Sequence, residues 1–228
     1  MTDQDGFAWR FDWGLDGLCA LAPAADVVVV IDVLRFTTAV TVAVERGVSV
    51  TPAPLPFVPT GAPGRPWELS PRWIREHPAG AQLVLASPNG AALAVAAAEV
   101  GVAKLWAGCI RNAAAVARAA RASGAAVVAV IAAGEGRRPA VEDLLGAGAV
   151  LAALDPAAAI SAPACSPEAA AARAAFVAAR SRLAEALADS VTGRELAATG
   201  RGEDVADAAE LDVSRAVPVL RNGVFVAL

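Results

Sequence analysis

The chain has 228 residues, of which 57% are apolar, and a formal net charge of −4. This length suffices to bury a substantial core, whereas the acidic balance provides no basic surface of the kind that nucleic-acid binding requires. The longest apolar runs, such as residues 125–133, are far shorter than the roughly 20 residues that cross a bilayer. Because the acidic N-terminus also lacks the features of a secretory signal, we expect a cytoplasmic protein without membrane or nucleic-acid partners.

The cysteine and histidine content excludes several chemistries. Cys19, Cys109 and Cys165 are far apart in the sequence and match neither a disulfide framework nor a zinc site. We interpret them as small buried apolar residues. The only histidine, His77, precedes a proline and is expected in an exposed loop. A histidine-rich metal site or a Ser–His–Asp triad is therefore strongly disfavoured.

The first third of the chain predicts two strands, a helix and a third strand. Residues 7–13 alternate aromatic and polar side chains, which is typical of a half-buried strand. Residues 27–33 show no alternation, which favours a strand covered on both faces. A helix is predicted over residues 37–46, before Gly47, and a strand over residues 48–54. Residues 52–80, rich in proline and glycine, are expected to form an irregular connection.

Three strand–turn–helix units follow, which indicates βαβ winding. With the first unit they predict an α/β fold, a three-layer sandwich with a largely parallel central sheet, formed by one domain over residues 1–228. The alanine-rich residues 157–188 favour helix, and residues 192–212 predict two short helices joined by glycine. Residues 217–228 predict a hairpin around Asn222-Gly223. The three units have strands over 81–86, 103–108 and 125–134 and helices over 91–101, 113–124 and 144–155.

Polar side chains stand where the predicted strands end. In open α/β sheets ligands bind beyond the carboxyl ends of the strands, and right-handed crossovers bring those ends to one edge. Carboxylates there suit a divalent cation, whereas arginine and helix N-termini suit phosphate or sulfonate. The residues are Asp32, Arg35, Thr37, Thr38, Ser87, Asn89, Arg111, Asn112, Glu135, Glu142 and Asp143.

Each of these residues also has a purely structural interpretation. Asp32 could cap the following turn, and Arg35 could pair with a neighbouring acid. Asn89 precedes a glycine, as turns favour, and Asn112 could be a helix N-cap. The acids at 142–143 would stabilise a helix dipole. Their expected convergence on one edge favours a ligand site.

Several familiar site motifs are absent. A phosphatase with an Asp-x-Asp nucleophile would need an acid where Leu34 stands, and a cysteine phosphatase loop would need arginine at Ala115. No Gly-x-x-x-x-Gly-Lys sequence exists, which excludes a P-loop. Residues 146–151 carry only part of a dinucleotide-binding fingerprint and follow helical sequence, so we discount them.

Five stretches together resemble one family, the 2-phosphosulfolactate phosphatases (ComB-like proteins) of coenzyme M biosynthesis. The most specific is Ile-Asp-Val-Leu-Arg-Phe-Thr-Thr. The resemblance implies a ComB-like α/β sandwich, a homodimer, and a Mg²⁺-dependent phosphatase that acts on a small phosphorylated or sulfonated acid. The stretches are residues 27–47, 87–94, 107–117, 132–154 and 202–220.

The resemblance also implies roles for individual residues. Asp32, Arg35 and Glu142 would be catalytic, and Asp32, Glu142 and Asp143 would hold the metal. The residues that would bind substrate are Thr37, Thr38, Asn89, Gly90 and Asn112.

Departures from the family pattern leave an alternative open. The connection over residues 52–80 is shorter than in typical members and retains only Ser70-Pro71 of their Gly-Asn-Ser-Pro motif, with Glu68 nearby. Ser87-Pro88 replaces a pair of threonines. A non-catalytic or diverged binder of an anionic metabolite is therefore the second hypothesis, and a helical dimer scaffold without a ligand is the third.

Overall fold

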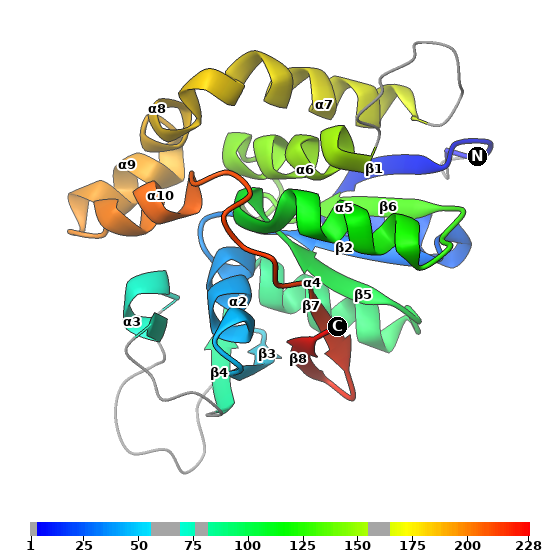
Figure 1. The fold of residues 1–228 in the computed structure, drawn as a ribbon, viewed down its shortest axis with the longest axis horizontal. Coiled ribbons are helices and arrows are strands. Elements are labelled where there is room, and N and C mark those ends of the chain that lie inside the picture. The colour runs from blue at the N-terminus through cyan, green and yellow to red at the C-terminus, as the bar shows by residue number, and fades with distance from the viewer. Residues whose placement is uncertain (1–3, 56–68, 76–81, 155–164) are drawn as a thin grey trace.

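The computed structural model describes residues 4–55, 69–75, 82–154 and 165–228. Its central feature is an eight-stranded mixed sheet (Figure 1). The described strands lie across the sheet in the order β1 (Trp9–Trp13), β6 (Val128–Ala132), β2 (Val27–Ile31), β5 (Leu105–Gly108), β7 (Pro218–Arg221), β8 (Val224–Ala227), β3 (Ser49–Ala53) and β4 (Gln82–Ala86).

The C-terminal hairpin lies inside the sheet rather than at its edge. Strands β1, β6, β2 and β5 pair in parallel, as do β3 and β4, but β7 and β8 are antiparallel to each other and to β5 and β3. By this pairing, β3 and β4 run in the opposite sense to β5. Our expectation that the strands form one parallel set is therefore wrong for β3 and β4, which are parallel only to each other.

The sheet twists strongly enough to compensate for this reversal. Figure 1 shows β4 turned well away from the direction of β2 and β6, with α2 (Phe36–Glu45) beside it. The carboxyl end of β4 consequently comes back to the end of β2, where the N–H of Gly90 lies 2.8 Å from a carboxylate oxygen of Asp32. Twist accumulates from strand to strand, and here it reunites two polar strand ends.

Strand β2 is buried on both faces, as the sequence predicts. Val27, Val29 and Ile31 belong to one hydrophobic core, whereas Val28 and Val30 belong to the other. Because successive side chains of a strand point to opposite faces, a strand with only apolar residues requires helices on both sides. The α/β sandwich with a largely parallel central sheet is confirmed.

The two cores assign the helices to the two faces of the sheet. Helices α1 (Gly14–Leu21), α2, α3 (Pro71–Arg75) and α4 (Gly90–Glu99) contribute to the core on one face. The other core contains residues of α5 (Ala113–Ala122), α6 (Val141–Leu154), α7 (Pro167–Ala179), α8 (Leu183–Ala188), α9 (Val191–Ala198) and α10 (Gly202–Ala208). In Figure 1, α7 lies outside α6 and α10 lies beyond the start of α2.

The glycines of residues 146–151 have a packing role. A Cβ on Gly146 would lie 2.5 Å from a methyl group of Val33, and one on Gly148 would lie 2.2 Å from the carbonyl oxygen of Ala172 on α7. Both glycines lie inside α6 and allow it to approach β2 and α7 closely. This geometry accounts for the partial dinucleotide fingerprint without a dinucleotide.

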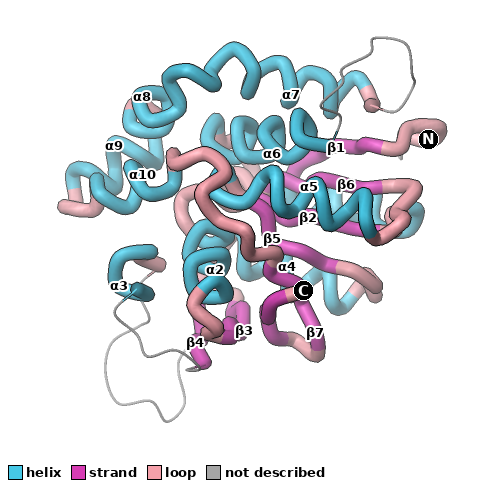
Figure 2. The backbone as a smooth tube through the Cα atoms, viewed as in Figure 1, coloured by secondary structure: helices cyan, strands magenta, loops and turns pink. Residues whose placement is uncertain are grey.

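The connection from α10 to β7 is fixed by hydrogen bonds. Figure 2 shows it as a loop that passes the start of α5. The N–H of Asp212 donates to the carbonyl of Ile110, the N–H of Ser214 donates to the carbonyl of Arg111, and the Asp212 carboxylate accepts from Ala114 N–H. These bonds hold α10 against the sheet end that contains Asp32.

Most predicted elements are present, and some predictions fall outside the described residues. The helices after β2, β4, β5 and β6, the two short C-terminal helices and the hairpin are confirmed. Helix α1 was not predicted. Cys109 is buried, but Cys19 is exposed and Cys165 is half-buried, so our interpretation of the cysteines is correct only for Cys109. No described helix is long and apolar enough to cross a membrane. Some predictions concern residues that the structure does not describe, namely His77, Glu68, most of residues 52–80 and residues 155–164.

Candidate active site

The side chain of Asp32 lies where two helices begin. Its Oδ1 accepts a hydrogen bond of 3.0 Å from the N–H of Phe36, the first residue of α2. Its Oδ2 accepts one of 2.8 Å from the N–H of Gly90, the first residue of α4, and one of 3.2 Å from Ser87 Oγ. Helix N-termini favour negative charge because their first N–H groups lack partners within the helix. Asp32 therefore marks an anion-stabilising position.

Gly90 can occupy its position only because it has no side chain. A Cβ there would lie 2.5 Å from Asp32 Oδ2 and 2.7 Å from Cδ1 of Phe36. The backbone of α4 thus directly contacts the carboxylate. The predicted importance of Gly90 has a steric basis, namely close backbone approach to Asp32.

Asp143 lies beside Asp32 and contacts the same turn. Its Oδ1 accepts a 2.7 Å hydrogen bond from the N–H of Val33, and its Oδ2 accepts a 2.9 Å hydrogen bond from the N–H of Gly134. The residue belongs to the first turn of α6 and is 3% exposed. A third helix start therefore contributes to the site.

The acids at this point are held in an unfavourable electrostatic environment. Burial raises the pKa of Asp32, although hydrogen bonds from Phe36 and Gly90 oppose this, and the charge of Glu135 raises it further. The pKa of Asp143 is raised well above its usual range by burial and by the charge of Asp32. Buried like charges of this kind favour either a bound proton or a neighbouring cation.

Glu142 has a free carboxylate in this environment. The residue is 3% exposed, and its side chain accepts no hydrogen bond within the described part of the chain. Its charge also raises the pKa of Asp143. A carboxylate held at low exposure beside other acids has the chemistry of a metal ligand.

Whether Mg²⁺ fits this site depends on how many carboxylate oxygens remain able to bind it. Among residues 4–55, 69–75, 82–154 and 165–228, no three carboxylate, thiol or imidazole groups form a metal site by themselves. Mg²⁺, however, is usually held by only one or two carboxylates together with waters and substrate phosphate. Asp32 Oδ1, with one N–H partner, and the Glu142 carboxylate retain acceptor capacity for such a site. Both oxygens of Asp143 accept backbone N–H groups.

The two threonines after Asp32 hold the turn between β2 and α2. Thr37 Oγ1 donates to the carbonyl of Asp32 and accepts from its N–H, and Thr38 Oγ1 donates to the carbonyl of Val33. Both side chains are fully buried. Their predicted contact with substrate gains no support from this geometry, which gives them the role of shaping the turn.

The side-chain oxygen and nitrogen of Asn112 likewise form hydrogen bonds within the protein. Its Oδ1 accepts from the N–H of Cys109, and its Nδ2 donates to the carbonyls of Ala107 and Ala216 and to Thr41 Oγ1. The residue is fully buried. Asn112 directly precedes α5, but its side chain makes no capping hydrogen bond there. Its role is structural in another way, because it joins β5 to the loop before β7.

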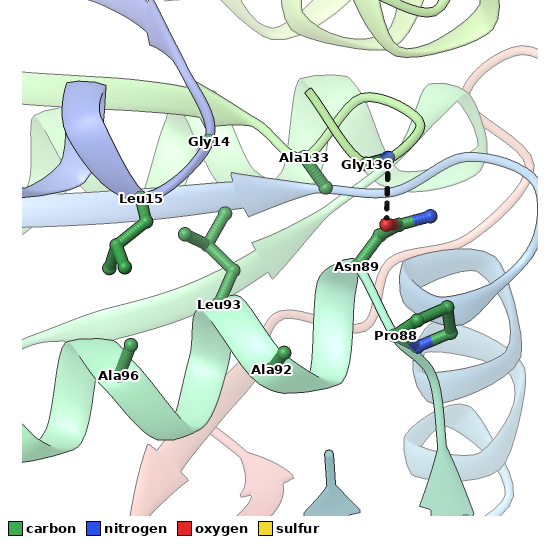
Figure 3. Close-up of a pocket in the computed structure, with 9 residues that line it drawn as sticks. All are labelled: Gly14, Leu15, Pro88, Asn89, Ala92, Leu93, Ala96, Ala133 and Gly136. Carbon is green, nitrogen blue, oxygen red and sulfur yellow. Dashed lines mark hydrogen bonds between the residues drawn. The ribbon is translucent and has the colours of Figure 1, made fainter. Parts of the chain in front are cut away.

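Asn89 lies at the edge of a neighbouring cavity of about 250 Å³ between α1 and α4. Figure 3 shows its side chain pointing across to the backbone of Gly136, with the bond from Gly136 N–H to Asn89 Oδ1 measuring 3.1 Å. Its Nδ2 donates to Glu135 at 3.2 Å. The remaining walls, which include Leu15 and Leu93, are mostly apolar. Asn89 thus joins the start of α4 to the loop that follows β6.

Arg35 forms an ion pair, as its structural interpretation allows, but the sequence analysis did not predict the partner. Its Nη1 lies 2.5 Å from Oδ2 of Asp204 on α10, and Oδ1 of Asp204 accepts a 2.7 Å hydrogen bond from Ser70 Oγ. The partner is separated from Arg35 by 169 positions. The only sequence signal was the acidic pattern of residues 202–212, which has no periodic feature that identifies its partner.

Together, the fold and the site define an α/β protein in which buried acids lie where three helices begin. A family model described as 2-phosphosulpholactate phosphatase matches residues 64–223, well over half of the chain. The chain belongs to this family of phosphoric monoester hydrolases. The matched region contains Asn89, Glu142 and Asp143 and begins after the turn that contains Asp32. No curated protein matches the chain significantly.

Proposed function

We propose that this protein is a Mg²⁺-dependent phosphomonoester hydrolase that acts on a small phosphorylated acid, with 2-phosphosulfolactate as the first candidate substrate. The observation that carries the proposal is the placement of the buried acids Asp32 and Asp143 at converging helix N-termini. Family membership supports phosphatase activity. The metal and the substrate are parts of the proposal.

Charge balance supports a cation at this site. A phosphate group beside Asp32 and Asp143 would be repelled by both carboxylates. The nearest arginine in sequence, Arg35, is already paired with Asp204. A divalent cation would offset the remaining negative charge, and Asp32 and Glu142 would hold it, with Asp143 adding its charge nearby. When bound, Mg²⁺ would supply Lewis-acid polarisation of the phosphoryl oxygens.

The chain's own residues would supply position and proton chemistry. Asp32 is the group that we place nearest to the phosphorus. Its carboxylate would either attack the phosphorus in line, displacing the alcohol oxygen of the ester and later being released by water, or accept a proton from a water that displaces the same oxygen. In both cases the departing alcohol oxygen takes up a proton. The N–H groups of Phe36 and Gly90 hold that carboxylate in one orientation. The N–H groups of Arg35 that have no partner among the described residues would bind the oxygens of the transferred group.

The proposal predicts an enzyme whose turnover requires a divalent cation. We expect hydrolysis of p-nitrophenyl phosphate and of 2-phosphosulfolactate with Mg²⁺, and loss of at least about a hundredfold in rate with EDTA, because metal activation contributes several kcal/mol. Phosphate release is the measurement, and restoration by added Mg²⁺ is the control. Equal turnover with and without EDTA would contradict the proposal.

One observation favours the second candidate, a non-catalytic binder of an anionic metabolite. Arg35 and Asn89, both expected to contact substrate, have polar partners within the protein. Thermal stabilisation by 2-phosphosulfolactate without phosphate release would identify such a binder. Release of phosphate from the same ligand would exclude it.

A further inference from the structure

We propose that Asp204 is a positioning residue for the anion site and acts through Arg35. It fixes one edge of the guanidinium group, so that the other N–H groups face the oxyanion beside Asp32. The inference rests on the proposed function, because it takes Arg35 as the group that binds the oxyanion. It adds a residue of the C-terminal helices to the machinery of the site.

The Arg35–Asp204 pair is largely buried, and both carboxylate oxygens of Asp204 accept hydrogen bonds. The side chains of Arg35 and Asp204 are 12% and 5% exposed. Asp204 Oδ2 accepts from Arg35 at 2.5 Å, and its Oδ1 accepts from Ser70 Oγ at 2.7 Å. A guanidinium group has five N–H donors, and the bond to Asp204 involves only Nη1. Donors therefore remain for a second partner.

Arg35 lies next to the site along the chain. Arg35 is the residue before α2, directly preceding Phe36, whose N–H binds Asp32 Oδ1. If Arg35 left Asp204 to reach a ligand, a buried carboxylate would lose its cation, which is strongly unfavourable. The pair is therefore expected to persist when an oxyanion binds, with Asp204 as support rather than as competitor.

Other acids of α10 and the following turn form ion pairs of a different kind. Glu203 pairs with Arg72, with side chains 72% and 64% exposed, and such surface pairs contribute little. Asp207 pairs with Arg75 on α3. Within the described residues, Asp204 is the acid of this helix that reaches the turn after β2. Glu203→Gln is thus a matched control, one position away on the same helix.

Ser70 connects the same pair to α3. Its Oγ accepts from the N–H of Trp73 at 3.3 Å while donating to Asp204, and its carbonyl accepts from the N–H of Ile74. Ser70 directly precedes α3, and its hydroxyl supports the carboxylate that holds Arg35.

A double-mutant cycle on phosphate affinity tests the inference. Binding of inorganic phosphate, with Mg²⁺ present, would be measured by calorimetry for wild type, Asp204→Asn, Arg35→Gln and the double variant. We expect Asp204→Asn to weaken phosphate binding about tenfold, because it loosens a charge-assisted contact. In the Arg35→Gln background it should cause no further loss, because its effect passes through Arg35. Ser70→Ala should weaken binding about threefold, and Glu203→Gln should leave it within twofold.

Each outcome decides the inference. Additive losses in the cycle would show that Asp204 acts on the fold rather than through Arg35. Tighter phosphate binding by Asp204→Asn would show that the carboxylate competes with the ligand, and absence of phosphate binding by wild type would remove the site itself; either result overturns the proposal. If Asp204→Asn fails to fold by circular dichroism, Ser70→Ala in the two Arg35 backgrounds provides the same cycle. If the protein binds phosphate but hydrolyses no phosphomonoester, the proposed hydrolase function is wrong, whereas the positioning role of Asp204 still stands.

Discussion

Asp32→Asn is expected to lower the turnover number about a thousandfold, because it removes the carboxylate that we place nearest to the phosphorus. Asparagine keeps the size of the side chain but offers one oxygen where Asp32 accepts from Phe36, Gly90 and Ser87 with two. The loss should appear mainly in kcat, measured with p-nitrophenyl phosphate under saturating Mg²⁺.

Asp26→Asn is the matched control for this prediction. Asp26 lies just before β2, and its carboxylate also accepts two backbone N–H groups, from Ala126 and Val127. It is at the opposite end of the strand from the site. Its replacement should therefore leave kcat within about twofold. Wild-type turnover in Asp32→Asn would contradict the assignment of Asp32.

Gly90→Ala is expected to lower turnover about a hundredfold and to destabilise the protein by about 1–3 kcal/mol. The new Cβ would lie only 2.5 Å from Asp32 Oδ2 and 2.7 Å from Phe36 Cδ1, which is too close for either contact. Either α4 or the Asp32 carboxylate must move, which breaks the hydrogen bond from Gly90 N–H. Urea unfolding and kcat measured on the folded protein would report the two effects separately.

Gly148→Ala is the control that separates the loss of stability caused by a steric clash from the loss of turnover. Its Cβ would lie 2.2 Å from the carbonyl oxygen of Ala172, at the contact between α6 and α7 rather than beside Asp32. We expect comparable destabilisation with turnover of the folded protein changed by less than about threefold. A Gly90→Ala variant that retains full turnover would show that the approach of α4 to Asp32 has no catalytic importance.

The sequence was most informative where periodicity alone decides the structure. A run of β-branched residues such as 27–31 favours an interior strand of an α/β sheet, and Asn222-Gly223 indicates a hairpin turn locally. The repeated strand–turn–helix units likewise predict parallel pairing. None of these local patterns specifies where the hairpin inserts, because β7 pairs with β5, more than 100 positions earlier in the chain.

The candidate site was predictable to a different degree for each residue. Asp32, Gly90 and Asp143 are joined by hydrogen bonds around one turn, as expected from polar groups at strand ends. Thr38 and Asn112 satisfy backbone groups instead, and a single sequence does not distinguish a polar side chain that binds ligand from one that binds its own backbone. The Asp204 contact depends on tertiary placement of α10 and has no local signature.

The central claim is that the buried acids around Asp32 and Asp143 accept a divalent cation. Calorimetric titration with Mg²⁺ tests this claim most directly. Two buffers of different ionisation enthalpy are used, so that the number of protons released on binding is also measured. Because the pKa values of both acids are raised without metal, lowering the pH protonates them, and a cation must displace those protons. The account predicts Mg²⁺ binding that releases protons, weakens as the pH is lowered, and is lost in Asp32→Asn but kept in Asp26→Asn. Absence of Mg²⁺ binding, or equal binding and equal proton release by Asp32→Asn, would contradict it.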